Sequence, residues 1–166
     1  MTAIENKIRQ LRAWEHKKET LSTCCLSNSE RVLNRYAFRG SIYLVNFGEN
    51  LGVEINRKRP ALILSPNDFN KYSGAVTVVP ITKKLIYADV NQERPKYPYH
   101  YFISKSAYPF LNFNSCIECE QVRTISKSRI IKFLGKLNSN DISIVSSKVN
   151  NFISWLRCKL LIESNR

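Results

Sequence analysis

The sequence lacks a long hydrophobic run. Its most apolar stretches, residues 61–64 (ALIL) and 75–81 (AVTVVPI), are far shorter than the roughly 20 residues that a membrane-spanning helix needs. Residues 1–19 mix charged and apolar side chains and contain no apolar core of about 7–15 residues, which a secretory signal requires. We therefore expect a cytoplasmic protein without a membrane partner.

Carboxylates are scarce, and this argues against metal-dependent chemistry. The sequence has only three aspartates, Asp68, Asp89 and Asp141, which are far apart and form no D-x-D pattern. A two-metal nuclease needs clustered carboxylates to hold hard cations. Neither His16 nor His100 stands in the H-x-E and P-C-x-x-C arrangement of the zinc deaminases. The sequence therefore predicts no metal site and no cofactor.

The five cysteines do not suggest a disulfide framework, because their number is odd and we expect no secretory signal. Cys116 and Cys119 form a C-x-x-C, but the surrounding SCIECEQV is typical of a strand, in which residues three apart point to opposite faces. We therefore expect reduced thiols without a zinc or redox role. The same interpretation applies to the adjacent Cys24 and Cys25.

Basic residues are abundant: 26 Lys and Arg stand against 13 Asp and Glu, which gives a net charge of +13. Such an excess indicates a polyanionic partner, although a solvated basic surface without a ligand is the alternative. Two segments concentrate the charge. Residues 57–84 hold six basic residues and one acid, and residues 120–136 hold five basic residues and one acid.

The length of 166 residues is typical of one folded domain with an appendage. Apolar residues recur at helical spacing over residues 3–21 and predict an amphipathic helix that covers an apolar patch or a partner. A Ser-rich linker at 22–30 and a short helix at 29–37 are expected next. We therefore predict a helical N-terminal extension and linker at 1–38 and a barrel domain at 39–166.

After residue 38 the sequence changes to β character. Short alternating or β-branched runs, separated by turn residues, predict a compact barrel or sandwich. A helix capped by Ser139 or Asn140 follows, with one apolar stripe that we interpret as core. The stripe consists of Ile142, Val145, Val149, Phe152 and Leu156. The predicted strands are 41–47, 60–65, 75–81, 99–104 and 115–125.

Three blocks stand in a fixed order: RGSIYLVNFGENLGVEINRKRPALILS, NKYSGAVTVVPITKK, and SCIECEQVRTISKSRI followed by KLNSNDISIVSSKV. Their order and spacing resemble those of the MazF/PemK family of toxin endoribonucleases, from about Arg39 to Leu156. The resemblance implies a mainly β fold, a small SH3-like β-barrel with a C-terminal helix. It also implies a homodimer that cuts single-stranded RNA or mRNA without a metal and is neutralised by an acidic antitoxin. DNA would be a partner only indirectly, through the antitoxin.

The reaction that remains, once metal chemistry is disfavoured, uses a nucleophile from the substrate. The ribose 2′-OH attacks the adjacent phosphate and leaves 2′,3′-cyclic phosphate and 5′-OH ends, so DNA could not be cut. The protein must supply a base for the 2′-OH proton, an acid for the leaving 5′-oxygen and positive charge for the phosphorane.

The family's catalytic arginine carries over onto Arg59, in Arg59-Pro60, and its catalytic threonine onto Thr82. Because a guanidinium stays protonated, we expect Arg59 to bind phosphate and stabilise charge rather than to take a proton. Thr82 would hold or polarise a phosphate oxygen. Glu54 is predicted as a general base or as a group that reads an RNA base, with a solvated loop carboxylate as the alternative.

Other side chains are predicted to bind RNA or to support the site. Lysines would bind phosphates, and an aromatic ring beside a basic loop would stack on an unpaired base unless it belongs to the core. We interpret the EQVRT block at 120–124 as a supporting strand. His100 is expected to be a hydrogen-bonded structural residue. The predicted residues are Lys58, Lys83, Lys84 and Phe47 for RNA binding, and Gln121 and Arg123 as scaffold.

The sequence departs from the family pattern in its N-terminal extension, at Gly52-Val53-Glu54-Ile55 and in segments 85–98 and 105–114. The extension could pack on the barrel, dimerise or occupy a groove that an antitoxin would otherwise fill. One alternative function is a catalytically silent SH3-like barrel that binds nucleic acid or a protein target such as gyrase. Another is a structural or regulatory partner that assembles through its N-terminal helix. The presence of both Arg59 and Thr82 favours the enzyme.

Overall fold

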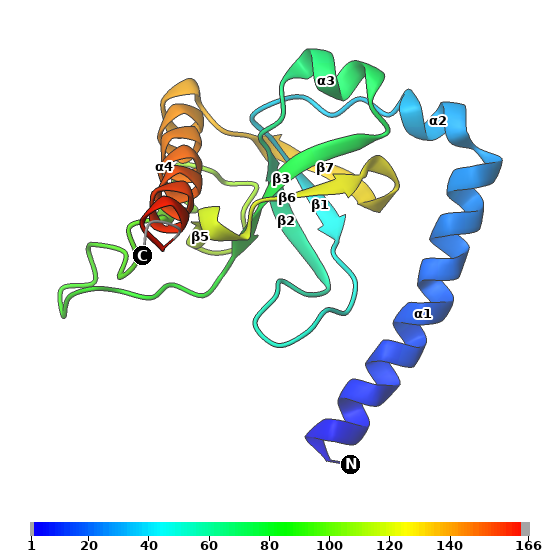
Figure 1. Cartoon of the computed structure of the whole chain (residues 1–166), viewed down its shortest axis with the longest axis horizontal. Helices are drawn as coiled ribbons and strands as arrows, with labels where there is room; N and C mark the ends of the chain where they lie inside the picture. Colours follow the sequence, from blue (N-terminus) through cyan, green and yellow to red (C-terminus); the bar gives the residue numbers. More distant parts are fainter. Residues whose placement is uncertain (1, 164–166) are drawn as a thin grey trace.

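The computed structural model of the protein describes the backbone of residues 2–163 and the side chains of residues 2–155. Two N-terminal helices precede a β-rich region, and a long helix ends the described chain (Figure 1). The helices are α1 (Ala3–Ser27), α2 (Ser29–Leu33), α3 (Asn67–Tyr72) and α4 (Ser139–Glu163), with short 3-10 helices η1 (Cys119–Gln121) and η2 (Lys127–Arg129). The strands are β1 (Ser41–Asn46), β2 (Lys58–Ile63), β3 (Ala75–Thr82), β4 (His100–Ile103), β5 (Ser115–Glu118), β6 (Arg123–Ser126) and β7 (Ile130–Lys136).

The strands form one antiparallel system in the order β4-β5-β3-β2-β1-β7. β3 is its longest strand. Its first half also pairs with β6, and its last two residues pair with β5. The path from β4 to β7 does not close on itself, but the barrel-like arrangement and the flanking helices confirm the predicted fold class.

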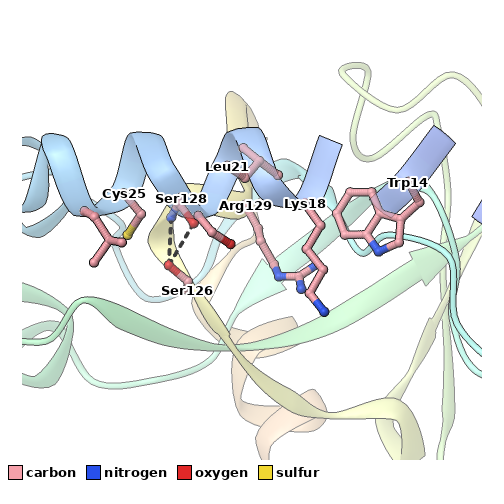
Figure 2. A pocket seen from close by; sticks show the side chains of 9 residues that line it. Trp14, Lys18, Leu21, Cys25, Ser126, Ser128 and Arg129 are labelled. Atoms are coloured by element: carbon pink, nitrogen blue, oxygen red, sulfur yellow. Dashed lines mark hydrogen bonds between the residues drawn. The ribbon is translucent and has the colours of Figure 1, made fainter. Parts of the chain in front are cut away.

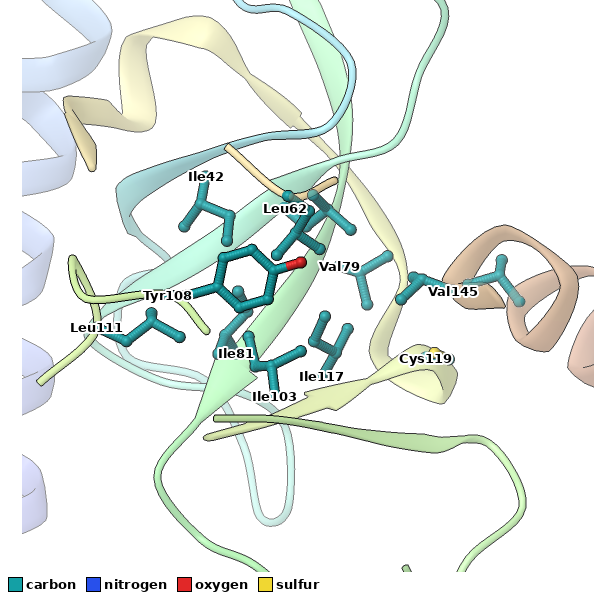
Figure 3. Packing of buried hydrophobic residues seen from close by; sticks show 12 residues of the cluster. Ile42, Leu62, Val79, Ile81, Ile103, Tyr108, Leu111, Ile117, Cys119 and Val145 are labelled. Atoms are coloured by element: carbon teal, nitrogen blue, oxygen red, sulfur yellow. The ribbon is translucent and has the colours of Figure 1, made fainter. Parts of the chain in front are cut away.

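Both faces of this system are buried. Leu62 and Ile63 are neighbours on β2, so their side chains point to opposite faces, and each is fully buried in a different apolar cluster. Figure 3 shows the cluster of Leu62, which fills the space between the sheet and α4 and includes Val145 of that helix. The cluster of Ile63 lies on the other face and includes Phe47 from the loop that follows β1.

The N-terminal helix is longer than predicted. It begins with a capping box between Thr2 and Glu5 and continues through the predicted linker to Ser27. The polar residues fit a helix because their hydroxyls donate back to main-chain carbonyls; Thr23 Oγ1, for example, lies 3.0 Å from the oxygen of Glu19. Asn28 alone separates α1 from α2, which ends at Leu33, earlier than expected.

The predicted apolar stripe of α1 does not cover the barrel. Ile4 and Ile8 are 73% and 44% exposed, and α1 has no buried residue. Trp14, which the predicted stripe includes, does contact the barrel and packs against Gly48. A Cβ on Gly48, whose φ is +87°, would stand 2.5 Å from atoms of the indole ring. The close approach of α1 therefore depends on this glycine.

Two further details differ from the sequence prediction. Asn138, rather than Ser139 or Asn140, caps α4, because its Oδ1 accepts from the amide of Asp141 at 2.8 Å. Val145 and Val149 of the predicted stripe are buried, whereas the side chain of Leu156 lies outside the described residues. Strand β7 and helix α3 are not among the predicted elements. No helix in residues 2–163 is long and apolar enough to cross a membrane.

Candidate active site

Arg59 and Thr82 come together through the pairing of β2 with β3. Ala61 stands opposite Pro80 in this ladder, and Ile63 opposite Val78. If this register is continued by two positions, Arg59 stands opposite Thr82, and both residues line one cavity. Directly opposed residues of antiparallel strands have their side chains on one face. The two predicted catalytic residues therefore share a face at one end of the ladder.

Arg59 is half-buried and partly fixed. Its Nε donates to the main-chain oxygen of Asn56 at 2.9 Å, which orients the guanidinium. No carboxylate among the described residues forms an ion pair with Arg59, and its terminal N–H groups make no hydrogen bond in this part of the chain. The side chain therefore presents the planar N–H edge that binds two phosphate oxygens at once.

Thr82 is 7% exposed and ends β3. Its Oγ1 accepts a hydrogen bond from the amide of Lys84 at 3.2 Å, which leaves the hydroxyl hydrogen available for a ligand. Lys83 and Lys84 are both exposed, and the Nζ of Lys83 lies 5.7 Å from the centre of the Phe113 ring. The end of β3 thus combines a hydroxyl donor with two mobile positive charges.

A cavity of about 340 Å³ opens beside these strand ends. Three lysines contribute to its wall and no carboxylate does, so it favours an anion. Lys58 and Lys83 were predicted to bind RNA. Lys132 was missed because the sequence did not reveal β7. The lining residues are Leu44, Lys58, Arg59, Pro60, Ile81, Thr82, Lys83, Phe110, Leu111, Asn112, Phe113, Ser115, Lys132 and Leu134.

Glu118 of β5 is a carboxylate that the sequence analysis did not select. It is half-buried, and burial raises its pKa, as does the charge of Glu120, whereas His100, Arg59 and Lys84 lower it. Glu118 is therefore within electrostatic reach of Arg59 and of Lys84. Sequence reasoning could not find it, because the pairing of β5 with β3 and β4 determines where this side chain lies.

His100 is 4% exposed and its Nε2 lies 3.0 Å from Oε1 of Glu120, which confirms the predicted hydrogen-bonded position. The EQVRT block is not one strand, however. Glu120 and Gln121 lie in η1, and only from Arg123 does β6 begin. Gln121 Oε1 accepts from Arg123 Nη2 at 3.5 Å, a weak contact that ties the block together.

Glu54 and Phe47 do not join this arrangement, and Lys84, although it follows Lys83, does not line the cavity. Glu54 is exposed in the β1–β2 loop (residues 47–57) and does not line the cavity. Phe47 is 3% exposed and packs in the core, with the guanidinium of Arg123 6.0 Å from its ring centre. The interpretation of Phe47 as an RNA-stacking ring is therefore corrected, because its faces are covered by protein.

The β1–β2 loop is held from both sides. Inside it, Asn50 Nδ2 donates to the oxygen of Ile55 at 2.7 Å. Within the loop, Glu49 also accepts from Arg57 Nε at 3.3 Å, and from outside it Lys7 Nζ of α1 donates to Glu49 at 2.8 Å. Lys7 also lowers the pKa of Glu49, as does Arg57. Because the loop leads directly into Arg59, α1 helps to fix the approach to the site.

No group of three or more His, Cys, Asp or Glu side chains within the described region is arranged to hold a metal ion. The two cysteines of the C-x-x-C are both fully buried, Cys116 in β5 and Cys119 in η1. Burial, the largest cause, raises the pKa of each thiol to about 12.

Residues 38–153 match the family of PemK-like, MazF-like toxins of type II toxin-antitoxin systems. Endoribonuclease MazF of Staphylococcus saprophyticus is 32% identical over 112 residues, which are 68% of this chain and 87% of that protein. MazF of Deinococcus radiodurans shares the fold at 22% identity, with a TM-score of 0.59 over 72% of this chain and 97% of the other. An endoribonuclease from Mycobacterial species, solved in complex with its cognate antitoxin, also shares the fold. It is 18% identical, with a TM-score of 0.55 over 71% of this chain and 95% of the other. The chain therefore belongs to the PemK-like, MazF-like toxins of type II toxin-antitoxin systems.

Proposed function

We propose that this protein cuts single-stranded RNA, mRNA included, at internal phosphodiester bonds without a metal ion. Family membership confirms the coarser prediction, an endoribonuclease toxin of a toxin-antitoxin system. The observation that supports the finer statement is that Arg59 and Thr82, from the paired strands β2 and β3, line one cavity together with three lysines.

The proposed reaction is a transesterification. A bond forms between the ribose 2′-oxygen and phosphorus as the 2′-OH loses its proton, and the bond from phosphorus to the 5′-oxygen breaks. The leaving 5′-oxygen takes up a proton from solvent, and the products are a 2′,3′-cyclic phosphate and a 5′-hydroxyl. The terminal N–H groups of Arg59 hold two phosphate oxygens and stabilise the charge of the phosphorane. The hydroxyl of Thr82 donates to a phosphate oxygen as well.

Glu118 is the carboxylate we assign as the base that takes the 2′-OH proton. Burial raises the pKa of Glu118, which makes this carboxylate a stronger base than an exposed one. Glu118 does not line the cavity itself, but the charges of Arg59 and Lys84 act on it. Glu54, exposed in the β1–β2 loop, retains the second of its predicted roles, contact with an RNA base. The lysines around the cavity bind flanking phosphates.

The proposed partners follow from charge and family. The net charge of +13 suits both RNA and an acidic antitoxin, and among the structural relatives are MazE–MazF complexes from Deinococcus radiodurans. We propose that the protein acts in the cytoplasm as a homodimer. DNA is contacted only indirectly, through the antitoxin.

The decisive experiment incubates the protein with a mixed-sequence single-stranded RNA and with its DNA counterpart in EDTA. Arg59→Ala serves as the inactive variant, and the ends of the products are sequenced. Sequence-selective cuts with 2′,3′-cyclic phosphate ends, absent on DNA and lost in Arg59→Ala, are the expected result. Intact RNA after incubation with folded protein would instead point to the silent nucleic-acid-binding barrel.

A further inference from the structure

A second cavity, of about 370 Å³, separates α1 from the segment that joins β6 to β7. α1 and α4 lie at opposite sides of the β-domain (Figure 1), so this cavity is on the side away from α4. We call it the basic cavity, because its lining includes two cations and three hydroxyls but no carboxylate. It is lined by Trp14, Lys18, Leu21, Ser22, Cys25, Leu26, Ser126, Ser128 and Arg129.

Arg129 is a half-buried cation without a counter-charge. Its Nη1 donates to the main-chain oxygens of Asn46 at 3.2 Å and Phe47 at 3.0 Å, and its guanidinium lies 5.4 Å from the centre of the Trp14 ring. Burial and the charge of Arg123 lower its pKa. In the part of the chain that the structure describes, no carboxylate pairs with it. An anion would offset this buried charge.

Lys18 adds a second positive charge at the same place. Lys18 is exposed on α1 and lines the same cavity as Arg129 (Figure 2). Ser126 and Ser128, whose hydroxyl oxygens lie 2.9 Å apart, line the cavity and supply further hydrogen-bonding groups.

The basic cavity is connected to the candidate active site. Arg129 holds the carbonyls of Asn46 and Phe47, where the β1–β2 loop begins, and that loop ends next to Arg59. Arg123 stands at the Phe47 ring and acts electrostatically on Arg129. A single-stranded RNA bound at Arg59 carries one phosphate for every nucleotide, and phosphodiesters are the anions that Arg and Lys bind best in such interfaces.

We propose that Lys18 and Arg129 bind a backbone phosphate of the RNA away from the bond that is cut, so that α1 forms part of the RNA-binding surface. This inference rests on the proposed function. The cavity selects no base, since phosphate contacts carry no direct sequence information. It instead lengthens the stretch of RNA that the protein holds.

The test compares Lys18→Glu with Lys17→Glu, which makes the same charge change on the adjacent exposed residue outside the cavity. Binding of a long and a short 2′-O-methyl RNA, which lack the attacking hydroxyl, is measured by fluorescence anisotropy over a range of salt concentrations. We expect Lys18→Glu to weaken binding of the long RNA about tenfold more than Lys17→Glu and to reduce the salt dependence by about one phosphate contact. The short RNA, which reaches only Arg59, is expected to bind alike to both.

Lys18→Gln introduces no repulsion and is expected to give a smaller loss in the same direction, and far-UV circular dichroism checks that α1 is intact in each variant. Equal binding of the long RNA by the Lys18 variants and Lys17→Glu would overturn the inference while leaving the proposed function in place. A wild-type protein that neither binds nor cuts RNA would overturn both.

Discussion

Arg59, near the start of β2, and Thr82, at the end of β3, line one cavity. Both residues belong to strands that pair with each other, so strand pairing and not the conformation of a loop positions them. Neither residue depends on the other for its hydrogen bond, since Arg59 donates to Asn56 and Thr82 accepts from the amide of Lys84. Either residue can therefore be substituted while the pairing of β2 with β3 stays intact.

The first prediction concerns the shape of the Arg59 side chain. Arg59→Lys keeps the positive charge but loses the planar pair of N–H donors, and we expect kcat/KM for RNA cleavage to fall about 100-fold. Lys17→Gln, at an exposed position outside the cavity, is the control and is expected to change cleavage far less. Single-turnover cleavage and thermal unfolding of each variant are the measurements. If Arg59→Lys cleaved RNA nearly as fast as the wild type, the proposal that Arg59 binds two phosphate oxygens at once would be wrong.

The second prediction concerns the stability effect of Glu118. Because burial raises its pKa in the folded protein above the usual value of 4.5, the folded state binds the proton more tightly than the unfolded state. Ionised Glu118 therefore costs stability once the pH rises through that folded pKa. Glu118→Gln is expected to match the wild type in Tm near pH 4, to exceed it as the pH rises from 4.5 through the folded pKa, and to keep a constant advantage above that pKa, as thermal unfolding would show.

The same variant tests the assignment of Glu118 as the base. Glu118→Gln is expected to be more stable and slower at RNA cleavage, since an amide cannot take the proton. Glu93→Gln, at an exposed position, is the matched control and is expected to change neither property. A Tm difference that does not vary with pH would contradict the electrostatic effect, and unchanged cleavage would contradict the catalytic role.

The third prediction concerns the thiols. Cys116 and Cys119 are fully buried with their pKa raised to about 12, whereas Cys24 is exposed. Since the thiolate is the reactive form, iodoacetamide at pH 8 is expected to modify Cys24 well before either residue of the C-x-x-C. Peptide mapping by mass spectrometry gives the rates. Fast modification of Cys119 in folded protein would show that η1 opens readily.

The fourth prediction concerns the link between Lys7 and Glu49. Lys7→Met removes the ion pair, and we expect faster amide hydrogen exchange in the β1–β2 loop with a loss of global stability of at most about 1 kcal/mol. Lys17→Met is the control.

The ion pair also has a defined pH dependence. Because Lys7 lowers the pKa of Glu49, the pair stabilises the folded protein at pH values above 4.5, the usual pKa of Glu. This stabilisation is lost as the pH falls through the folded pKa of Glu49. Unchanged exchange at pH 7 would show that α1 does not hold the loop.

Local patterns predicted the elements whose apolar residues are buried. β1 and β3 alternate or branch at Cβ and are almost wholly buried, so the sequence indicated both. β7 was missed because its apolar residues do not mark a buried face: Ile131 and Phe133 are 42% and 57% exposed. For α1, periodicity predicted the helix but not its contacts, which depend on Trp14 and on a glycine in a distant loop.

The candidate site was predicted only where the resemblance to a family supplied a role. Arg59 and Thr82 carried over from motifs, and the structure aligns them. Glu118 and Arg129 had no motif, and their importance arises from strand register and from burial beside other cations. The prediction that Phe47 stacks on RNA was wrong, because a sequence does not say whether an aromatic ring beside a basic loop faces solvent or the core. Phe47 faces the core.

Neither α1 nor α2 contributes a buried residue, yet α1 contacts the loop before Arg59 and forms one wall of the basic cavity. Folding of the barrel and the reach of its RNA-binding surface are thus encoded in different stretches of the chain. Substitutions on α1 are therefore expected to have little effect on the packing of the two core clusters. If α1 binds RNA as proposed, the length of RNA that the protein holds can change over evolutionary time without endangering the fold.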